Sequence, residues 1–188
     1  MNSFKRNPKI LSTTSTALLI IDIQERILGV MQNSESVVSN TVKLIKGFKV
    51  LNLPVFFTEQ YPKGLGSTAK QIADELNGTE PIQKMSFSCF GAEDLFRRLS
   101  DKKISQVVIA GIESHVCVQQ TALDLIANNF QVNIPADAVS SRKEIDYKTA
   151  LERMRSNGAE ITTAESVLFE LLNVCGTDEF KQISKLVK

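Results

Sequence analysis

Three residues that could carry out chemistry together follow separate apolar segments of the chain: Asp22, Lys84 and Cys117. A thiol can attack a carbonyl carbon, a carboxylate can take the proton of the thiol, and an ammonium group can stabilise either anion. These residue types therefore indicate nucleophilic catalysis by a cysteine. Each also has a structural interpretation, because Cys117 could be a small buried hydrophobe, Asp22 a helix cap and Lys84 a surface lysine.

The sequence around Cys117 predicts that a buried strand turns into a helix there. The apolar run at 107–110 is typical of a strand buried on both faces. Apolar residues at helical spacing follow it: Val118, Ala122, Leu125 and Ile126. Cys117 would then lie in the first helical turn, where unpaired N–H groups and the helix dipole favour negative charge. We therefore expect the pKa of this thiol to lie below the ordinary cysteine value of about 8.5.

Short apolar segments that alternate with helical patterns run along the whole chain. Strands are expected at 17–21, 55–58, 81–83, 107–110, 131–134 and 159–162. Helices are expected at 37–51, 69–76, 95–99, 118–126, 144–157, 165–172 and 178–187. This alternation predicts an α/β fold, a three-layer α/β/α sandwich with a mostly parallel, Rossmann-like six-stranded sheet.

A parallel sheet would bring the three reactive residues together. In open α/β sheets the ligand crevice lies beyond the carboxyl ends of the strands, where the strand order reverses. Asp22, Lys84 and Cys117 follow the first, third and fourth expected strands, so all three would meet at that edge. The length of 188 residues suits one domain, which we place at 16–188 after a lead-in at 1–15.

Composition excludes several classes of function. The net charge is +1 and the charges are interspersed, so the sequence offers no field for nucleic acid or for a membrane surface. The first residues lack the apolar core of a signal peptide, and no apolar run approaches the ~18 residues of a membrane span, so a cytoplasmic location is expected.

The three cysteines lack C-x-x-C spacing and are expected to be reduced thiols. No G-x-G-x-x-G motif follows the first strand, which disfavours dinucleotide binding.

Three ordered segments resemble the isochorismatase-like cysteine hydrolases: Ile20 to Gln24, Lys84 to Phe90 and Gly111 to Val118. The resemblance runs from about Ala17 to the C-terminus. It is closest to the isochorismatase domain-containing proteins, through Thr58 to Gly66, Asp137 to Arg142 and Ala150 to Arg155.

The resemblance implies roles for the reactive residues. Asp22 would be the base, Lys84 its electrostatic partner and Cys117 the nucleophile. A non-proline cis peptide is implied at Ile112–Glu113, with the backbone N–H groups of Glu113 and Cys117 forming an oxyanion hole. The expected activity is hydrolysis of small molecules, at amide-type C–N bonds and through a thioester, without a cofactor. The alternative is a catalytically silent or redox-sensing interaction protein that keeps the fold. Relatives form dimers or larger rings, so a homo-oligomer is expected.

The remaining site predictions concern the pocket wall. Gln24 is expected to donate to the substrate, Tyr61 and Phe87 to supply apolar walls, and His115 to line the entrance, although aromatic residues more often belong to a core. His115 as a base for Cys117 is disfavoured, because side chains two residues apart at a helix start diverge.

The sequence also bears on a possible metal site and on the role of Cys89. Nicotinamidases of the superfamily bind a metal through one Asp and two His, whereas this chain has a single histidine, so no metal site is expected. Cys89 could be a core residue or a redox partner of Cys117, and the core interpretation is favoured.

Overall fold

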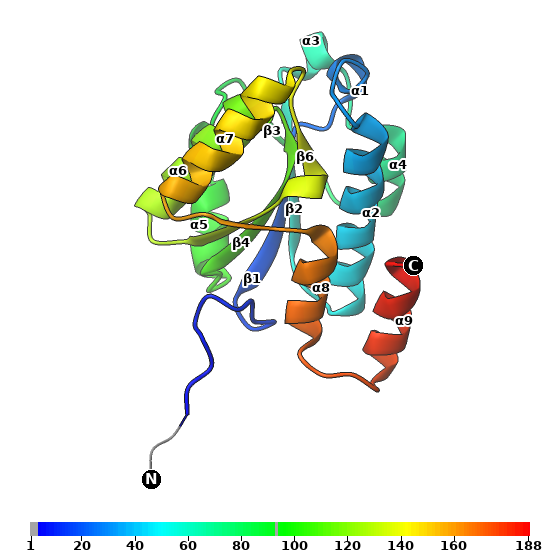
Figure 1. Cartoon of the computed structure of the whole chain (residues 1–188). Coiled ribbons are helices and arrows are strands. Elements are labelled where there is room, and N and C mark those ends of the chain that lie inside the picture. Colours follow the sequence, from blue (N-terminus) through cyan, green and yellow to red (C-terminus); the bar gives the residue numbers. More distant parts are fainter. Residues whose placement is uncertain (1–3, 93) are drawn as a thin grey trace.

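The computed structural model describes residues 4–92 and 94–188. Within these residues a seven-stranded parallel sheet runs through the centre of the molecule in the order β3-β2-β1-β4-β5-β7, and β6 pairs with β4 (Figure 1). The strands are β1 (Thr16–Ile21), β2 (Val55–Gln60), β3 (Ile82–Lys84), β4 (Gln106–Ile112), β5 (Gln131–Pro135), β6 (Val139–Ser140) and β7 (Glu160–Thr162). The predicted Rossmann-like α/β/α sandwich is confirmed.

Helices cover both faces of the sheet, as Figure 1 shows. One layer holds α2 (Ser34–Val50), α4 (Lys70–Glu75), α8 (Ala164–Leu172) and α9 (Asp178–Leu186). The other layer holds α5 (Leu95–Asp101), α6 (Gln119–Ala127) and α7 (Glu144–Ser156). Two short helices, α1 (Glu25–Leu28) and α3 (Pro62–Leu65), lie beyond the carboxyl ends of the strands.

The apolar runs in the sequence are explained by burial on both faces. All six residues of β1 are buried. Leu18 and Ile20 belong to the cluster beneath α2 and α8, whereas Leu19 and Ile21 belong to the cluster beneath α5 and α6. Successive side chains of a strand point to opposite faces, so a strand between two helical layers needs apolar residues at every position.

The strand order reverses between β1 and β4. The chain leaves β1, crosses through α2 and adds β2 and then β3 on one side, while β4 and β5 extend the sheet on the other side. The carboxyl ends of β1 and β4 therefore flank the crevice at which α/β proteins bind ligands. Asp22 and the segment that carries Cys117 follow these two strands directly.

Gly111 permits β1 and β4 to run this close together. Its φ is +147°, a conformation that L side chains rarely adopt. A Cβ atom at this position would lie 2.3 Å from the carbonyl oxygen of Ile21. Only glycine therefore fits at this point of the sheet.

Two predictions about elements were wrong. The sheet has a seventh strand, β6, which was missed because two residues are too short to give an apolar pattern. The helix after β4 does not begin as a regular α-helix: the π-helical segment η2 (Ser114–Val118) comes first, and α6 starts only at Gln119. Helical spacing alone cannot distinguish a wide π turn from the first turn of an α-helix.

Candidate active site

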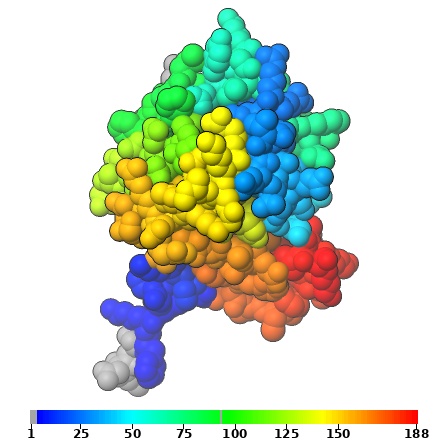
Figure 2. All heavy atoms as spheres, turned by 45° about the horizontal axis from the view of Figure 1, so that its top comes forward, coloured from blue at the N-terminus to red at the C-terminus, as the bar shows by residue number. Residues whose placement is uncertain are grey.

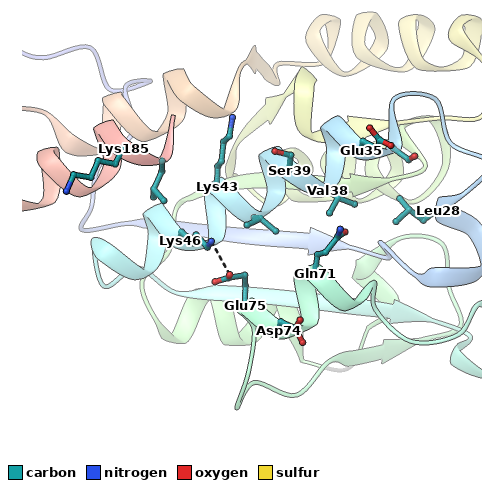
Figure 3. A pocket seen from close by; sticks show the side chains of 13 residues that line it. Leu28, Glu35, Val38, Ser39, Lys43, Lys46, Gln71, Asp74, Glu75 and Lys185 are labelled. Atoms are coloured by element: carbon teal, nitrogen blue, oxygen red, sulfur yellow. Dashed lines mark ion pairs between the residues drawn. The ribbon is translucent and has the colours of Figure 1, made fainter. Parts of the chain in front are cut away.

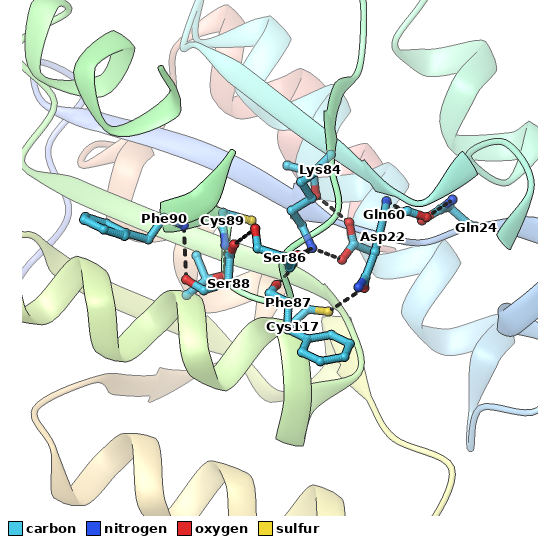
Figure 4. A network of polar contacts seen from close by, with 12 residues as sticks. Asp22, Gln24, Gln60, Lys84, Ser86, Phe87, Ser88, Cys89, Phe90 and Cys117 are labelled. Atoms are coloured by element: carbon cyan, nitrogen blue, oxygen red, sulfur yellow. Dashed lines mark hydrogen bonds and ion pairs between the residues drawn. The ribbon is translucent and has the colours of Figure 1, made fainter. Parts of the chain in front are cut away.

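A buried ion pair lies at the carboxyl edge of the sheet (Figure 4). Lys84 Nζ is 2.6 Å from Asp22 Oδ2, and the two side chains are 0% and 3% exposed. The ammonium group also donates to the carbonyl oxygens of Ser86, at 3.1 Å, and Phe87, at 2.9 Å. The structural interpretations of Asp22 as a helix cap and of Lys84 as a surface lysine are therefore wrong.

The ends of three neighbouring strands position this pair. Asp22 follows β1 with φ +53°, in the left-handed region that aspartate tolerates better than most residues. Lys84 is the last residue of β3, two strands away, and β2 lies between them. Thr58 of β2 donates its hydroxyl proton to Asp22 Oδ1 at 2.7 Å. Both carboxylate oxygens of Asp22 thus have a donor.

Cys117 lies in η2 and faces the same crevice. The residue is 4% exposed, and its sulfur lines a cavity that Asp22 also lines. The thiol donates to Gln60 Oε1, with 3.1 Å between Sγ and the oxygen. The structure therefore brings Asp22, Lys84 and Cys117 to one place, as the order of the strands predicted.

The expected low pKa of the Cys117 thiol is contradicted. Burial raises the pKa well above the ordinary cysteine value, the Asp22 carboxylate raises it further, and Lys84 offsets only part of this effect. The reason is that the sulfur lies among apolar groups beside a carboxylate and does not lie in the first turn of α6. The free protein holds Cys117 as a thiol, so a base is needed to form the thiolate.

The pKa of Lys84 indicates that this side chain stays an ammonium group. Burial alone would lower this pKa, but the Asp22 carboxylate, together with the sulfur groups of Cys89 and Cys117, offsets the effect, and the pKa is raised above the usual lysine value. An ammonium group beside a buried carboxylate therefore persists through the neutral range.

The cavity beside Cys117 has a volume of about 280 Å³. Its wall includes Tyr61 and Phe87, which were predicted to supply apolar walls. Glu113, predicted only as a backbone donor, and Gln60, which was not predicted, also line it. Other lining residues are Asp22, Ile27, Leu65, Ile112, Val116 and Cys117. Figure 2 looks toward this end of the molecule, where the segments that carry α1 and α3 lie side by side. Arg26 of α1 joins them by donating to the carbonyl oxygens of Lys63 and Gly64.

Two predicted substrate-binding residues do not line the cavity. The Gln24 amide is fully buried and pairs with the backbone of Gln60, donating to its carbonyl oxygen at 3.1 Å and accepting from its N–H at 2.8 Å. It also donates to the carbonyl oxygen of Gly66 at 2.6 Å. Gln24 therefore fixes the segment after β2 and has no donor left for a substrate.

His115 points away from the thiol. Its Nδ1 is 3.0 Å from the hydroxyl oxygen of Ser141, and its Nε2 is 3.9 Å from a carboxylate oxygen of Asp146 in α7. His115 is not among the described residues that line the cavity, and its place at the entrance stays a prediction. The divergence of neighbouring side chains, which argued against His115 as a base, also carries it out of the cavity.

Glu113 occupies the turn between β4 and η2, and the Ile112–Glu113 peptide bond is cis, as the resemblance implied. The Glu113 carboxylate accepts from the side chain of Arg142 at 2.9 Å and from its backbone N–H at 3.3 Å. This carboxylate is therefore already bound by a cation at the edge of the cavity.

Gln60 and Thr58 are the functional candidates that the sequence prediction missed. Both lie in β2, which extends to Gln60, two residues beyond the predicted end of the strand. Their position could have identified them, because both are polar residues at the carboxyl end of a buried parallel strand. Asp22, Lys84 and Cys117 were selected by the same criterion.

Cys89 belongs to the core, as favoured from the sequence. It is 0% exposed within the apolar cluster beneath α5 and α6, and its N–H donates to the hydroxyl of Thr121 at 2.9 Å. Burial raises the pKa of this thiol to about 11. Phe90 lies outside the cavity, 61% exposed, with its ring packed edge to face on Phe96.

A larger hollow lies elsewhere on the surface. This open groove of about 870 Å³ runs between α2, α4 and α9 (Figure 3). Charged side chains line much of it, and Lys46 pairs across it with Glu75 at 3.2 Å. None of Asp22, Lys84 and Cys117 lines this groove, so volume alone does not identify the site of chemistry.

The described residues contain neither a cluster of metal ligands nor a helix of membrane-spanning character. In residues 4–92 and 94–188, no three histidine, cysteine or acidic side chains are grouped as ligands of a metal ion would be. No helix in the same ranges is long and apolar enough to cross a membrane.

Comparisons with known proteins agree with the geometry. The family model described as the isochorismatase domain matches residues 16–166. Isochorismatase domain-containing protein 2 of Danio rerio is 38% identical over 94% of this chain and 89% of its own length. The secreted isochorismatase effector Isc1 of Phytophthora sojae is 39% identical over 93% of this chain and 85% of its own length.

Solved structures show the same fold. The structure of the MAR1 ribonuclease from Caenorhabditis elegans is 34% identical and has a TM-score of 0.87, and the match covers 94% of this chain and 91% of that one. The family resemblance inferred from the three sequence segments is confirmed.

Proposed function

Because the chain belongs to the isochorismatase family, we propose that it hydrolyses amide-type C–N bonds of small molecules with Cys117 as the nucleophile. One observation carries the proposal. The sulfur of Cys117 and the carboxylate of Asp22 line the same small cavity, and Lys84 holds that carboxylate at 2.6 Å.

In the first half of the reaction, the thiol proton passes to Asp22 after the S–H bond rotates away from Gln60. The sulfur lone pair forms a bond to the carbonyl carbon, and the π electrons move onto the oxygen. The backbone N–H groups of Glu113 and Cys117 would hold this oxyanion. The C–N bond then breaks, the amine takes the proton from Asp22, and a thioester remains on Cys117.

In the second half, water attacks the thioester and gives its proton to Asp22. The C–S bond breaks, the acid leaves, and the sulfur recovers its proton. Lys84 remains an ammonium throughout, since its pKa is raised, and its positive charge lies 2.6 Å from the Asp22 carboxylate. The raised pKa of Cys117 agrees with this order of events, because the thiolate forms only when the base acts.

The same pKa disfavours the redox-sensing alternative. Cysteines that sense oxidants are accessible thiols of low pKa, whereas Cys117 is 4% exposed and its pKa is raised. The name of the C. elegans relative suggests RNA as another substrate. No lysine or arginine is among the described residues that line the cavity, which disfavours binding of a phosphate backbone.

The test is ammonia release from a panel of small primary amides, with hydroxylamine added to trap the thioester as a hydroxamate. We expect turnover by the wild type and by Cys175→Ser, which alters an exposed thiol, and none by Cys117→Ala. Amide turnover that survives Cys117→Ala would contradict the proposed nucleophile. Reversible oxidation of Cys117 without amide turnover would support the redox alternative, and RNA cleavage that requires Cys117 would replace the amide proposal.

A further inference from the structure

The walls of the cavity beside Cys117 are mainly apolar. Six aliphatic or aromatic side chains line it: Ile27, Tyr61, Leu65, Phe87, Ile112 and Val116. Its volume of about 280 Å³ is below the range of roughly 300–1,000 Å³ in which proteins hold drug-sized ligands. A substrate must therefore be small, and most of its surface must pack against hydrocarbon.

The charged groups at the cavity are already paired within the protein. Two charged side chains are among its described lining residues, and both are acids. Asp22 pairs with Lys84 at 2.6 Å, and Glu113 pairs with Arg142 at 2.9 Å. Neither acid is therefore available as an unpaired charge for a ligand.

The cation nearest the thiol has no free donor. The Lys84 ammonium has three N–H groups, and it donates to Asp22 and to the carbonyl oxygens of Ser86 and Phe87. A carboxylate on the substrate would lose its hydration beside two acids and gain no cation. An ammonium on the substrate would lose its hydration against Ile27, Leu65 and Val116.

From these pairings we infer that the substrate is a small uncharged amide with a short apolar acyl group. The inference rests on the proposed function and adds the class of substrate. Asp22, Gln60 and Cys117 cluster at the reacting end of the cavity, and the ring of Phe87 lies beside the thiol (Figure 4). The acyl group packs against the apolar walls.

Two pairs of amides of equal size test this inference. Isocaproamide and succinamate differ in an isopropyl group and a carboxylate, whereas pentanamide and γ-aminobutyramide differ in a methyl group and an ammonium. In each pair, kcat/KM for the neutral amide should be at least about 100-fold higher, because an unpaired charge must leave water to enter the cavity. The measurement is ammonia release at neutral pH.

A variant that supplies a cation should change the preference. Leu65 is a half-buried residue of α3 at the cavity wall, and Leu65→Lys should raise kcat/KM for succinamate about 10-fold while lowering that for isocaproamide. Leu65→Met is the matched control and should keep the preference for the neutral amide. Ile27→Lys, on the other side of the α1–α3 contact, repeats the test if Leu65→Lys does not fold by circular dichroism.

The outcomes separate the two proposals. If no amide in the panel releases ammonia, the proposed function fails. If amides are hydrolysed but succinamate or γ-aminobutyramide reacts as fast as its neutral partner, the proposed function stands and the inference about charge is overturned. A preference for neutral amides that Leu65→Lys and Ile27→Lys both leave unchanged would also overturn it, since the cavity wall would then not set the preference.

Discussion

At the scale of single residues, the central feature is a protonated thiol beside a carboxylate that is held by an ammonium group. Burial and the Asp22 carboxylate raise the pKa of Cys117, and Lys84 lowers it. The same carboxylate raises the pKa of Lys84. Because the pKa of Cys117 is raised on balance, its thiol keeps its proton until a substrate arrives. This coupling gives two predictions, one about the pKa of Cys117 and one about the free energy of unfolding.

The first prediction concerns Asp22→Asn. Removal of the carboxylate charge should lower the pKa of Cys117, so alkylation by iodoacetamide should begin at lower pH than in the wild type. Amide turnover should nevertheless fall by roughly 10²–10⁴-fold, because the base is lost. Mass spectrometry of the alkylated peptides across pH measures the first effect, and the exposed Cys175 serves as an internal control.

In the wild type, the inflection for Cys117 should lie above the ordinary cysteine value of about 8.5. An inflection below that value would contradict the argument from burial and would agree with the helix-terminus effect that the sequence suggested.

The second prediction concerns Lys84→Met. The substitution leaves the buried Asp22 carboxylate without its cation, which should reduce the free energy of unfolding by about 3–5 kcal/mol in urea titrations. Because the pKa of Lys84 is raised in the folded state, the ammonium stabilises the protein at neutral pH. This contribution is lost only as the pH rises above the usual lysine value of about 10.4.

Lys70→Met is the matched control, since Lys70 pairs with Asp74 on the surface with both side chains exposed. Equal losses of stability for Lys70→Met and Lys84→Met would show that the buried pair has no special importance.

At the scale of elements, the close approach of β1 and β4 decides where the reactive groups lie. The two strands pair over six positions, from Thr16 opposite Gln106 to Ile21 opposite Gly111. Gly111 thus lies one residue before the end of β4. Its partner across the strands is Ile21, the residue that precedes Asp22. Any change that separates the strands here should displace both Asp22 and Cys117.

The third prediction compares glycines. Gly111→Ala combines a positive φ with a Cβ atom 2.3 Å from the Ile21 carbonyl oxygen, and it should cost about 3 kcal/mol or more of stability. Gly78→Ala has a positive φ but open space, and it should cost about 1 kcal/mol. Gly29→Ala has neither feature and should cost least. Thermal and urea unfolding measure the order, and a loss for Gly111→Ala no larger than for Gly78→Ala would contradict the role of close packing.

At the scale of the whole molecule, self-association and a cytoplasmic location remain predictions. Several large apolar side chains are exposed near the segment after β3: Met85 at 72%, Phe87 at 54% and Phe90 at 61%. Exposed apolar groups that lie close together are typical of surfaces that contact another protein.

The fourth prediction is therefore that the protein sediments as a homo-oligomer in analytical ultracentrifugation at micromolar concentration. The double substitution Met85→Ser and Phe90→Ser should shift the equilibrium toward the monomer, because it removes apolar surface from the contact. Exposed Val174→Ser, on the loop before α9, is the control. A monomer at all concentrations would refute the prediction.

The residue pattern of the chain is enough to predict the alternation of strands and helices and the three residues that converge. Apolar runs such as 107–110 mark strands buried on both faces, and the carboxyl ends of parallel strands meet at one edge wherever the strands are found. Asp22, Lys84 and Cys117 could therefore be placed together without coordinates. The family followed from the segments around them.

Only the tertiary structure decided what surrounds those residues. The pKa of Cys117 depends on its burial and on the charges of Asp22 and Lys84. His115 contacts the hydroxyl of Ser141, and Gln24 bonds to backbone groups of the distant Gln60 and Gly66. The spacing of apolar residues along the sequence predicts which residues are buried and where strands end, because burial follows the regular period of each strand or helix. The electrostatic field at a thiol is a sum over three-dimensional neighbours, so it is fixed only when the chain has folded.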